Sequence, residues 1–144
     1  MPDRAGEDLQ EIAHMPLLDL PFTEGYLYQI RSTVAAHASQ AQLSTALIDE
    51  LVLIASELVI NTVRHGGGVG QLSMWADRGH VYLQVADSGP GMPNPGAAGR
   101  EQPAPGEEHG RGLWVVRTLS AQLTITSGQE GTTVLAALPI RTRL

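Results

Sequence analysis

The segment from Ser44 to His65 constrains the fold more than any other part of the 144-residue chain. Its apolar side chains recur at helical spacing and fill most of the helix circumference: Leu47, Leu51, Ile54, Ala55, Leu58 and Val59. At about 100° per residue, one polar stripe remains, made of Glu50, Glu57, Asn61 and Arg64. Glycines at 66–68 end the pattern. The segment therefore predicts a long, largely buried helix with one polar stripe.

Shorter patterns on either side of this helix predict the other elements. Runs typical of strands occur at 15–22, 72–76, 81–86, 123–126 and 134–138. Helical spacing predicts two more helices, one capped by Thr23 and reaching Ala38, the other opening at Gly112 and passing Leu119. This order of elements predicts an α+β fold, with an antiparallel or mixed sheet and helices on one face.

Composition excludes several function classes. The formal charge is -6 and no run of basic residues occurs, so nucleic acid is not expected as a partner. The chain has no cysteine, which excludes thiolate metal sites and a cysteine nucleophile. All nine basic residues are arginine, so the chain lacks the lysine of a Walker A loop and the ion-paired lysine of eukaryotic-type protein kinases.

Three further expectations concern organisation and location. Residues 1–14 are polar and predict a flexible tail, which leaves 15–144 as a single domain. The sequence has neither a membrane-spanning apolar run nor a secretory signal, so a cytoplasmic protein with no membrane partner is expected. The stretch from Asp87 to Gly112 is rich in glycine and proline and is long for a connection, so we interpret about 92–110 as a mobile lid.

Glu57 and Asn61 are the first candidate site residues. They lie one helical turn apart and project to the same side of the predicted helix. A carboxylate is costly to bury without a partner, and the amide beside it offers an oxygen of the kind that Mg²⁺ prefers. The alternative is an ordinary surface ion pair, such as one between Glu57 and Arg64, and the helix pattern alone does not separate the two.

Two glycine-bearing loops supply the other candidates. The loop Asp87-Ser88-Gly89-Pro90-Gly91-Met92 follows a predicted strand; its glycines allow a planar ligand to approach, and its carboxylate can accept from an exocyclic amine. The loop Gly110-Arg111-Gly112-Leu113 opens a predicted helix, whose free N–H groups and dipole suit a phosphate. Taken singly, the first is also compatible with an ordinary turn and the second with helix-start packing.

Taken in order, these segments resemble a known family. Glu57-x-x-x-Asn61, Asp87-x-Gly89-x-Gly91, Gly110-x-Gly112-Leu113 and Gly131-Thr132-Thr133 are similar to the N, G1, G2 and G3 boxes of the Bergerat-fold (GHKL) ATPases. That superfamily includes histidine kinases, gyrase and Hsp90-like chaperones. The resemblance runs from about Leu51 to Leu138. It implies a two-layer α/β sandwich of the Bergerat ATP-binding type, with a mixed sheet and helices on one face.

Carried over position by position, the resemblance implies a site for ATP and Mg²⁺. Asn61 would ligate Mg²⁺ on the phosphates, and Glu57 would act as general base. Asp87 would bind the adenine amino group with Thr132 nearby, and the sequence leaves open whether Thr132 or Thr133 faces the base. The other nucleotide-contacting positions would be those of the glycine boxes: Gly89, Gly91, Met92, Gly110, Arg111, Gly112 and Leu113.

Within the superfamily, the chain looks like the small bacterial anti-sigma-factor serine/threonine kinases, because it is short and its lid has no phenylalanine. Such a kinase sequesters a sigma factor and phosphorylates an anti-anti-sigma antagonist, and homodimers are common in the family. Glu107 and Glu108 depart from the pattern, because those kinases often carry a basic residue there and negative charge opposes phosphoryl transfer. Two alternatives follow: a nucleotide-gated module that sequesters a regulator without kinase activity, and a structural α/β domain whose glycines only form turns.

Overall fold

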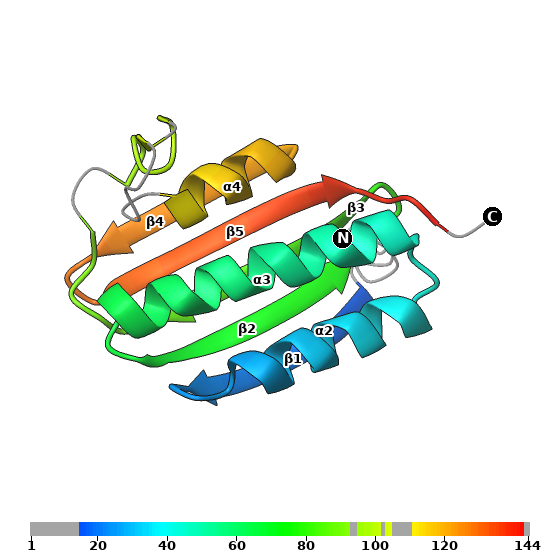
Figure 1. Cartoon of the computed structure of the whole chain (residues 1–144), viewed down its shortest axis with the longest axis horizontal. Helices are drawn as coiled ribbons and strands as arrows, with labels where there is room; N and C mark the ends of the chain where they lie inside the picture. The colour runs from blue at the N-terminus through cyan, green and yellow to red at the C-terminus, as the bar shows by residue number, and fades with distance from the viewer. Residues whose placement is uncertain (1–14, 93–94, 102, 105–110, 143–144) are drawn as a thin grey trace, which may run out of the picture.

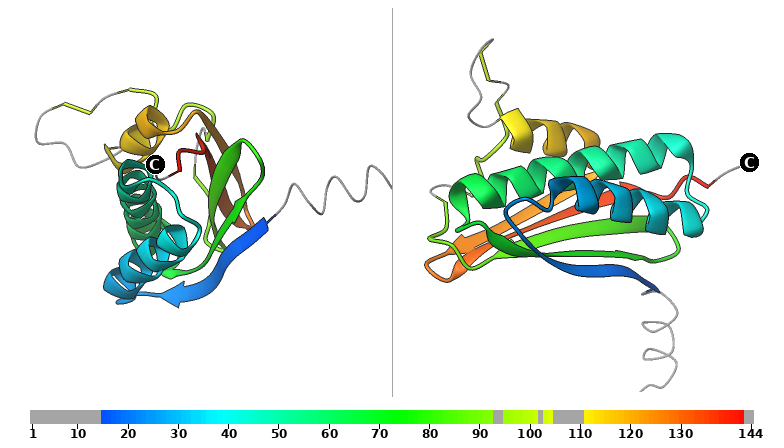
Figure 2. Two further views of the ribbon diagram at one scale, coloured as in Figure 1. Left: turned by 90° about the vertical axis from the view of Figure 1, so that its right-hand side faces the viewer. Right: turned by 60° about the horizontal axis from the view of Figure 1, so that its bottom comes forward.

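The computed structural model describes residues 15–92, 95–101, 103–104 and 111–142. Three helices lie on one face of a five-stranded sheet and leave its other face uncovered (Figure 1, Figure 2). The strands are β1 (Met15–Thr23), β2 (Val69–Ala76), β3 (His80–Asp87), β4 (Gln122–Gly128) and β5 (Gly131–Pro139). The helices are α2 (Leu27–Gln40), α3 (Thr45–His65) and α4 (Arg111–Leu119).

The strand order is β1-β2-β3-β5-β4, and every neighbouring pair is antiparallel. The connections explain this arrangement. Two helices join β1 to β2, so the chain reverses three times and β2 returns antiparallel to β1; tight hairpins make the pairs β2–β3 and β4–β5. The α+β class with helices on one face is confirmed. The sheet itself requires a correction: it is antiparallel throughout, not mixed.

Helix α3 lies in the middle of the helical layer, between α2 and α4 (Figure 1). Ser44, where the predicted helix begins, is its N-cap, because its Oγ accepts from the Leu47 N–H at 3.2 Å. The buried face includes all the apolar residues that the pattern selected, whereas Glu57 and Asn61 are half-buried. The predicted buried helix with one polar stripe is therefore confirmed. None of the described helices is both long and apolar enough to cross a membrane.

The start of α2 differs from the prediction. Thr23 ends β1 instead of capping the helix, and Tyr26 occupies the N-cap position without a side-chain cap hydrogen bond. The Tyr26 N–H donates to the Thr23 carbonyl at 3.3 Å, and Gly25 has a φ of 94°. A turn that needs a left-handed glycine therefore occupies the residues that the periodicity assigned to the first helical turn.

Strand β2 begins at Val69, earlier than the predicted Leu72. The extra residues pair with the end of β1, where Gly70 lies opposite Phe22. A Cβ at position 70 would come within 2.6 Å of the Phe22 ring. Glycine thus leaves space for a buried aromatic side chain here, and the strand continues through residues that the hydrophobic pattern treated as part of a turn.

Candidate functional site

Asp87 is the last residue of β3, and two backbone N–H groups orient its carboxylate. Its Oδ1 accepts from the Gly89 N–H at 2.9 Å and from the Thr132 N–H at 3.2 Å. Among the described residues no donor reaches Oδ2. Since no fully buried side-chain oxygen of the described part lacks a hydrogen bond, Oδ2 keeps some exposure to solvent. The aspartate therefore has one oxygen committed to the fold and one available to a ligand.

Three glycines pack closely around Asp87, one against its carboxylate and the others against nearby backbone. A Cβ at Gly66, the C-cap of α3, would lie 2.5 Å from Asp87 Cγ. A Cβ at Gly89 would lie 2.6 Å from Gly66 Cα, and a Cβ at Gly131 would lie 2.9 Å from the Asp87 carbonyl carbon. The end of α3, the loop after β3 and the start of β5 thus converge on Asp87. Only residues without side chains allow so close an approach.

Glu57 and Asn61 lie further along the same helix. A Cβ at Gly112, in the first turn of α4, would be 2.6 Å from Glu57 Oε2, so the start of α4 packs directly against this carboxylate. Neither Glu57 nor Asn61 has a hydrogen-bond partner among the described residues. Arg141 pairs with Glu50, and within the described ranges the alternative ion pair between Glu57 and Arg64 is not found.

Helix α3 connects the two halves of the candidate site. It meets the start of α4 at Glu57 and the Asp87 loop at Gly66, and Asn61 lies between these two contacts. Nine residues separate the contacts, which corresponds to about 13 Å along a helix. The carboxylate of Glu57, the amide of Asn61 and the aspartate that ends β3 therefore belong to one region of the molecule, as the order of the motifs predicted.

The loop after Asp87 packs against the β4–β5 hairpin. Gly91 has a φ of 84°, and a Cβ there would lie 3.1 Å from Ser127 Oγ. The Met92 N–H donates to Ser127 Oγ at 2.7 Å, and the half-buried Met92 side chain packs against the hydrophobic core. The sequence analysis did not select Ser127. Nothing in its spacing signals a partner 35 residues away.

Thr132 and Thr133 take different faces of β5. Thr132 is buried, and its N–H donates to Asp87. Thr133 is half-buried and pairs with Ala86, and successive residues of a strand point to opposite faces. The geometry therefore favours Thr132 over Thr133 as the threonine beside the aspartate.

The remaining predicted residues lie at or near the start of α4. Arg111 is the exposed first residue of the helix, where a guanidinium can meet an anion. Leu113 is buried among the core side chains and anchors this end of the helix. Gly110, together with Glu107 and Glu108, lies outside the described residues.

Residues 95–101, which lie in the stretch predicted to be a lid, contact α4 through Arg117. Arg117 Nε donates to the Ala98 carbonyl at 2.5 Å, and Arg117 Nη2 donates to the Gly96 carbonyl at 3.4 Å. The Arg100 guanidinium donates to the same Gly96 carbonyl. Burial, and to a lesser extent the neighbouring charge of Arg100, lowers the pKa of Arg117. Arg117, like Ser127, was not selected from the sequence. Its partners are backbone carbonyls of a loop, which residue spacing does not reveal.

These residues fit a magnesium nucleotide. An open carboxylate oxygen faced by glycines suits the amino group of a planar base. Carboxylate and amide oxygens on α3 suit Mg²⁺, which commonly takes one or two protein ligands and completes its shell with phosphates and water. No group of three His, Asp or Glu residues in the described part could hold a metal by itself.

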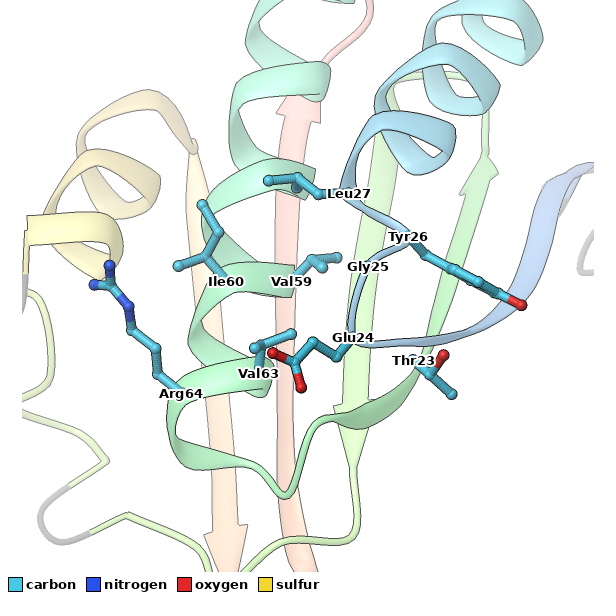
Figure 3. Close-up of a pocket in the computed structure, with 9 residues that line it drawn as sticks. All are labelled: Thr23, Glu24, Gly25, Tyr26, Leu27, Val59, Ile60, Val63 and Arg64. Carbon is cyan, nitrogen blue, oxygen red and sulfur yellow. The ribbon is translucent and has the colours of Figure 1, made fainter.

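A separate pocket of about 180 Å³ lies between the β1–α2 turn and α3 (Figure 3). Its lining residues are Thr23, Glu24, Gly25, Tyr26, Leu27, Val59, Ile60, Val63 and Arg64. None of the predicted nucleotide residues lines it. Its volume is also below the roughly 300–1,000 Å³ usual for ligand pockets. We therefore place the candidate site at the Asp87 loop and the facing residues of α3, outside the lining of this pocket.

The sequence is similar to that of a characterised protein. The chain is 35% identical to an anti-sigma F factor of Geobacillus stearothermophilus, over 44% of this chain and 47% of that protein. The match therefore spans about half the length of that relative.

Solved structures share the fold. The RsbU and RsbW domains of Rv1364c from Mycobacterium tuberculosis superpose with a TM-score of 0.63 at 20% identity, over 87% of this chain and 33% of that chain. The histidine kinase domain of the Erythrobacter litoralis EL346 blue-light activated histidine kinase gives 0.56 at 24% identity, over 80% and 63%. At these identities the likeness concerns the fold alone. Residues 20–138 match the histidine kinase-like ATPase domain. Because this match spans most of the sequence and the fold agrees with it, the chain belongs to the histidine kinase-like ATPase domain family.

Proposed function

We propose that this protein binds ATP with Mg²⁺ and acts as a serine/threonine kinase of the anti-sigma-factor type on an anti-anti-sigma antagonist. One observation carries the proposal. Asp87 is fixed through Oδ1 and open at Oδ2, beside the helix on which Glu57 and Asn61 also lack partners among the described residues. The names of the relatives, an anti-sigma F factor and an RsbW domain, support sigma-factor regulation as the setting.

In this proposal each part of the site has one task. Asp87 accepts a hydrogen bond from the adenine amino group, and Gly89 and Gly91, which pack closely against the backbones of Gly66 and Gly128, shape the loop that the base would enter. Asn61 holds the metal, which neutralises phosphate charge when bound. The start of α4, with Arg111 and Gly112, borders the phosphates, and the stretch at about 92–110 is the lid.

Glu57 is the proposed general base. It would take the proton of the attacking serine or threonine hydroxyl while the new oxygen–phosphorus bond forms and the bond to ADP breaks. Its carboxylate has no competing hydrogen bond within the described part of the chain, and Gly112 packs beside Oε2. These contacts support assigning Glu57 to the end of the site where the phosphates would lie.

The organisation of the protein forms part of the same proposal. Residues 15–144 make one ATP-binding domain that works in the cytoplasm, where sigma factors act, with the sigma factor and the antagonist as its partners. A homodimer is the proposed assembly. Size-exclusion chromatography with light scattering would test the assembly, and co-purification with a candidate sigma factor, with and without ATP, would test the partner.

Calorimetry and phosphate transfer test the central proposal. Titration with ATP should give a dissociation constant in the micromolar range when Mg²⁺ is present and weaker binding when EDTA removes it. Incubation with γ-labelled ATP and a candidate antagonist should then move label to a serine or threonine of the antagonist. No binding at millimolar ATP would instead support a structural α/β domain in which the glycines only form turns.

A second candidate is a nucleotide-gated module that sequesters a sigma factor or other regulator without kinase activity. The acidic pair Glu107 and Glu108 favours it, because negative charge near a γ-phosphate opposes transfer. This candidate predicts tight, ATP-dependent capture of a regulator with no labelled product. Label at stoichiometric yield on the antagonist would exclude it.

A further inference from the structure

Ser127, near the end of β4, makes two side-chain hydrogen bonds, one across its own hairpin to β5 and one that leaves the hairpin for the loop after Asp87. Its Oγ accepts from the Met92 N–H at 2.7 Å, and it shares a hydrogen bond of 2.8 Å with Thr132 Oγ1. A hydroxyl offers one donor and two acceptor sites, so it can satisfy both partners at once. Ser127 therefore connects the base of the lid to the threonine whose N–H orients Asp87.

Hydrogen bonds hold the loop 87–92 at both of its ends. At its first end, Asp87 Oδ1 accepts from the Gly89 N–H. At its other end, Ser127 Oγ holds the Met92 N–H, and Gly91 lies against the Gly128 carbonyl so closely that no side chain would fit. The loop that carries the predicted base-binding glycines is thus held at both ends, and only the second end depends on a side chain outside the predicted boxes.

We propose that Ser127 is a positioning residue for the nucleotide site. Its hydroxyl keeps the loop 87–92 in the binding geometry before the ligand arrives and sets the point at which the lid begins. The inference rests on the proposed nucleotide site. Preorganisation of this kind raises affinity because the ligand does not have to order the loop. Ser127 lies on the side of Asp87, so its loss should affect ATP and ADP alike and should leave the transfer step unchanged.

Three variants test the proposal by calorimetry with Mg–ATP and Mg–ADP. Ser127→Ala removes both hydrogen bonds and should weaken both nucleotides about tenfold. Ser127→Thr restores the hydroxyl on a residue that strands favour and should recover most of the affinity. Thr126→Ala is the matched control, because Thr126 is the exposed neighbour on the same strand. Equal affinity of Ser127→Ala and the parent protein would overturn the proposal, as would an equal loss in Thr126→Ala.

A second measurement needs no nucleotide. Amide hydrogen exchange at Met92, followed by NMR, should be faster in Ser127→Ala than in the parent protein and unchanged in Thr126→Ala. Should the parent protein bind no nucleotide, the proposed function fails, yet this exchange still decides whether Ser127 holds the loop. Unchanged exchange would overturn the positioning role. If Ser127→Ala folds poorly, Ser127→Cys keeps the side-chain shape with a much weaker hydrogen-bonding group and gives the same comparison.

Discussion

The turns Asp77-Arg78-Gly79 and Asp87-Ser88-Gly89 carry the same Asp-x-Gly pattern before and after the same strand, β3. In both, Oδ1 accepts from the N–H of the glycine two residues on, at 2.8 Å and 2.9 Å respectively. They differ at the second oxygen. The Tyr82 hydroxyl donates to Asp77 Oδ2 at 2.7 Å, whereas no described donor reaches Oδ2 of Asp87.

Glycines also approach the two aspartates to different degrees. Near Asp77, a Cβ at Gly79 would meet only an ordinary contact at 3.9 Å. Around Asp87, Gly66 and Gly131 approach so closely that they exclude any side chain. The pattern alone therefore predicts a turn. An oxygen left open among converging glycines is what distinguishes a candidate ligand site from a structural aspartate.

The largest expected effect concerns a third carboxylate, that of Glu57. Unlike Asp77 and Asp87, Glu57 has no hydrogen-bond partner in the described part of the chain. Glu57→Gln should slow phosphate transfer by about 10²–10⁴-fold and leave ATP affinity nearly unchanged, because only the proton acceptor is lost. The measurement is transfer of label at saturating ATP. Glu50→Gln is the matched control, since Glu50 lies on the same helix and pairs with Arg141 at the surface. Transfer at the parent rate by Glu57→Gln would disprove the assigned base.

Asp87→Asn and Asp77→Asn should have opposite consequences. An amide oxygen can still accept from the Gly89 and Thr132 N–H groups, but an NH₂ group then replaces the open oxygen, so Asp87→Asn should weaken ATP binding by about 10- to 100-fold with little change in Tm. Asp77→Asn should lower Tm and leave binding unchanged, because its oxygens are bonded within the hairpin. Calorimetry and thermal melts measure the two effects. Equal affinities in both variants would remove the distinction between the aspartates.

Gly66→Ala tests the space around Asp87. The φ of Gly66 is -105°, so alanine suits the backbone, but its Cβ would come within 2.5 Å of Asp87 Cγ. The overlap should destabilise the fold by about 1–3 kcal/mol, as overpacking does, and should weaken ATP binding. Gly79→Ala is the counterpart at the other turn and should change the unfolding free energy by less than about 0.5 kcal/mol. Chemical denaturation of both proteins measures the difference; equal stability would show that Asp87 can move aside.

The smallest expected effect belongs to Tyr82→Phe, which removes a hydrogen bond from Asp77. The Tyr82 hydroxyl is the main cause of the lowered pKa of Asp77. This contribution should therefore be fully present above the ordinary aspartate pKa of about 3.9 and disappear as the pH falls through the lower folded-state value. At neutral pH Tyr82→Phe should lower the free energy of unfolding by about 0.5 kcal/mol, since Asp77 is near the surface.

The same contact raises the pKa of Tyr82, mainly through its hydrogen bond to Asp77. The stabilisation that this hydrogen bond provides is therefore present below the ordinary tyrosine pKa of about 10. It is lost as the pH rises through the raised pKa of Tyr82 in the folded protein. We expect the difference in unfolding free energy between the parent protein and Tyr82→Phe to shrink at low pH. Measurements from about pH 3 to 8 test this expectation. A difference that stayed constant below pH 3.5 would contradict this assignment.

Helical and strand periodicity predicted most of the fold. The burial of α3, its Ser44 cap and its glycine stop all follow from local pattern, because a largely apolar helix circumference must be covered. The start of α2 was predicted wrongly, since a left-handed turn at Gly25 intervenes between β1 and the helix. The sheet was expected to be mixed, and only the path through two helices shows that β2 returns antiparallel to β1.

For the site, residue types and spacing were sufficient to select Glu57, Asn61 and Asp87 as candidates. They could not select Ser127 or Arg117, whose partners are backbone groups 35 and 19 residues away. Nor could they separate Asp87 from Asp77, because both turns share the same local hydrogen bond. The chain's own order of residues therefore specifies the helices, strands and motif types, which depend on near neighbours. Which carboxylate oxygen stays open depends on donors and glycines brought from distant segments, and only the folded arrangement of those segments decides it.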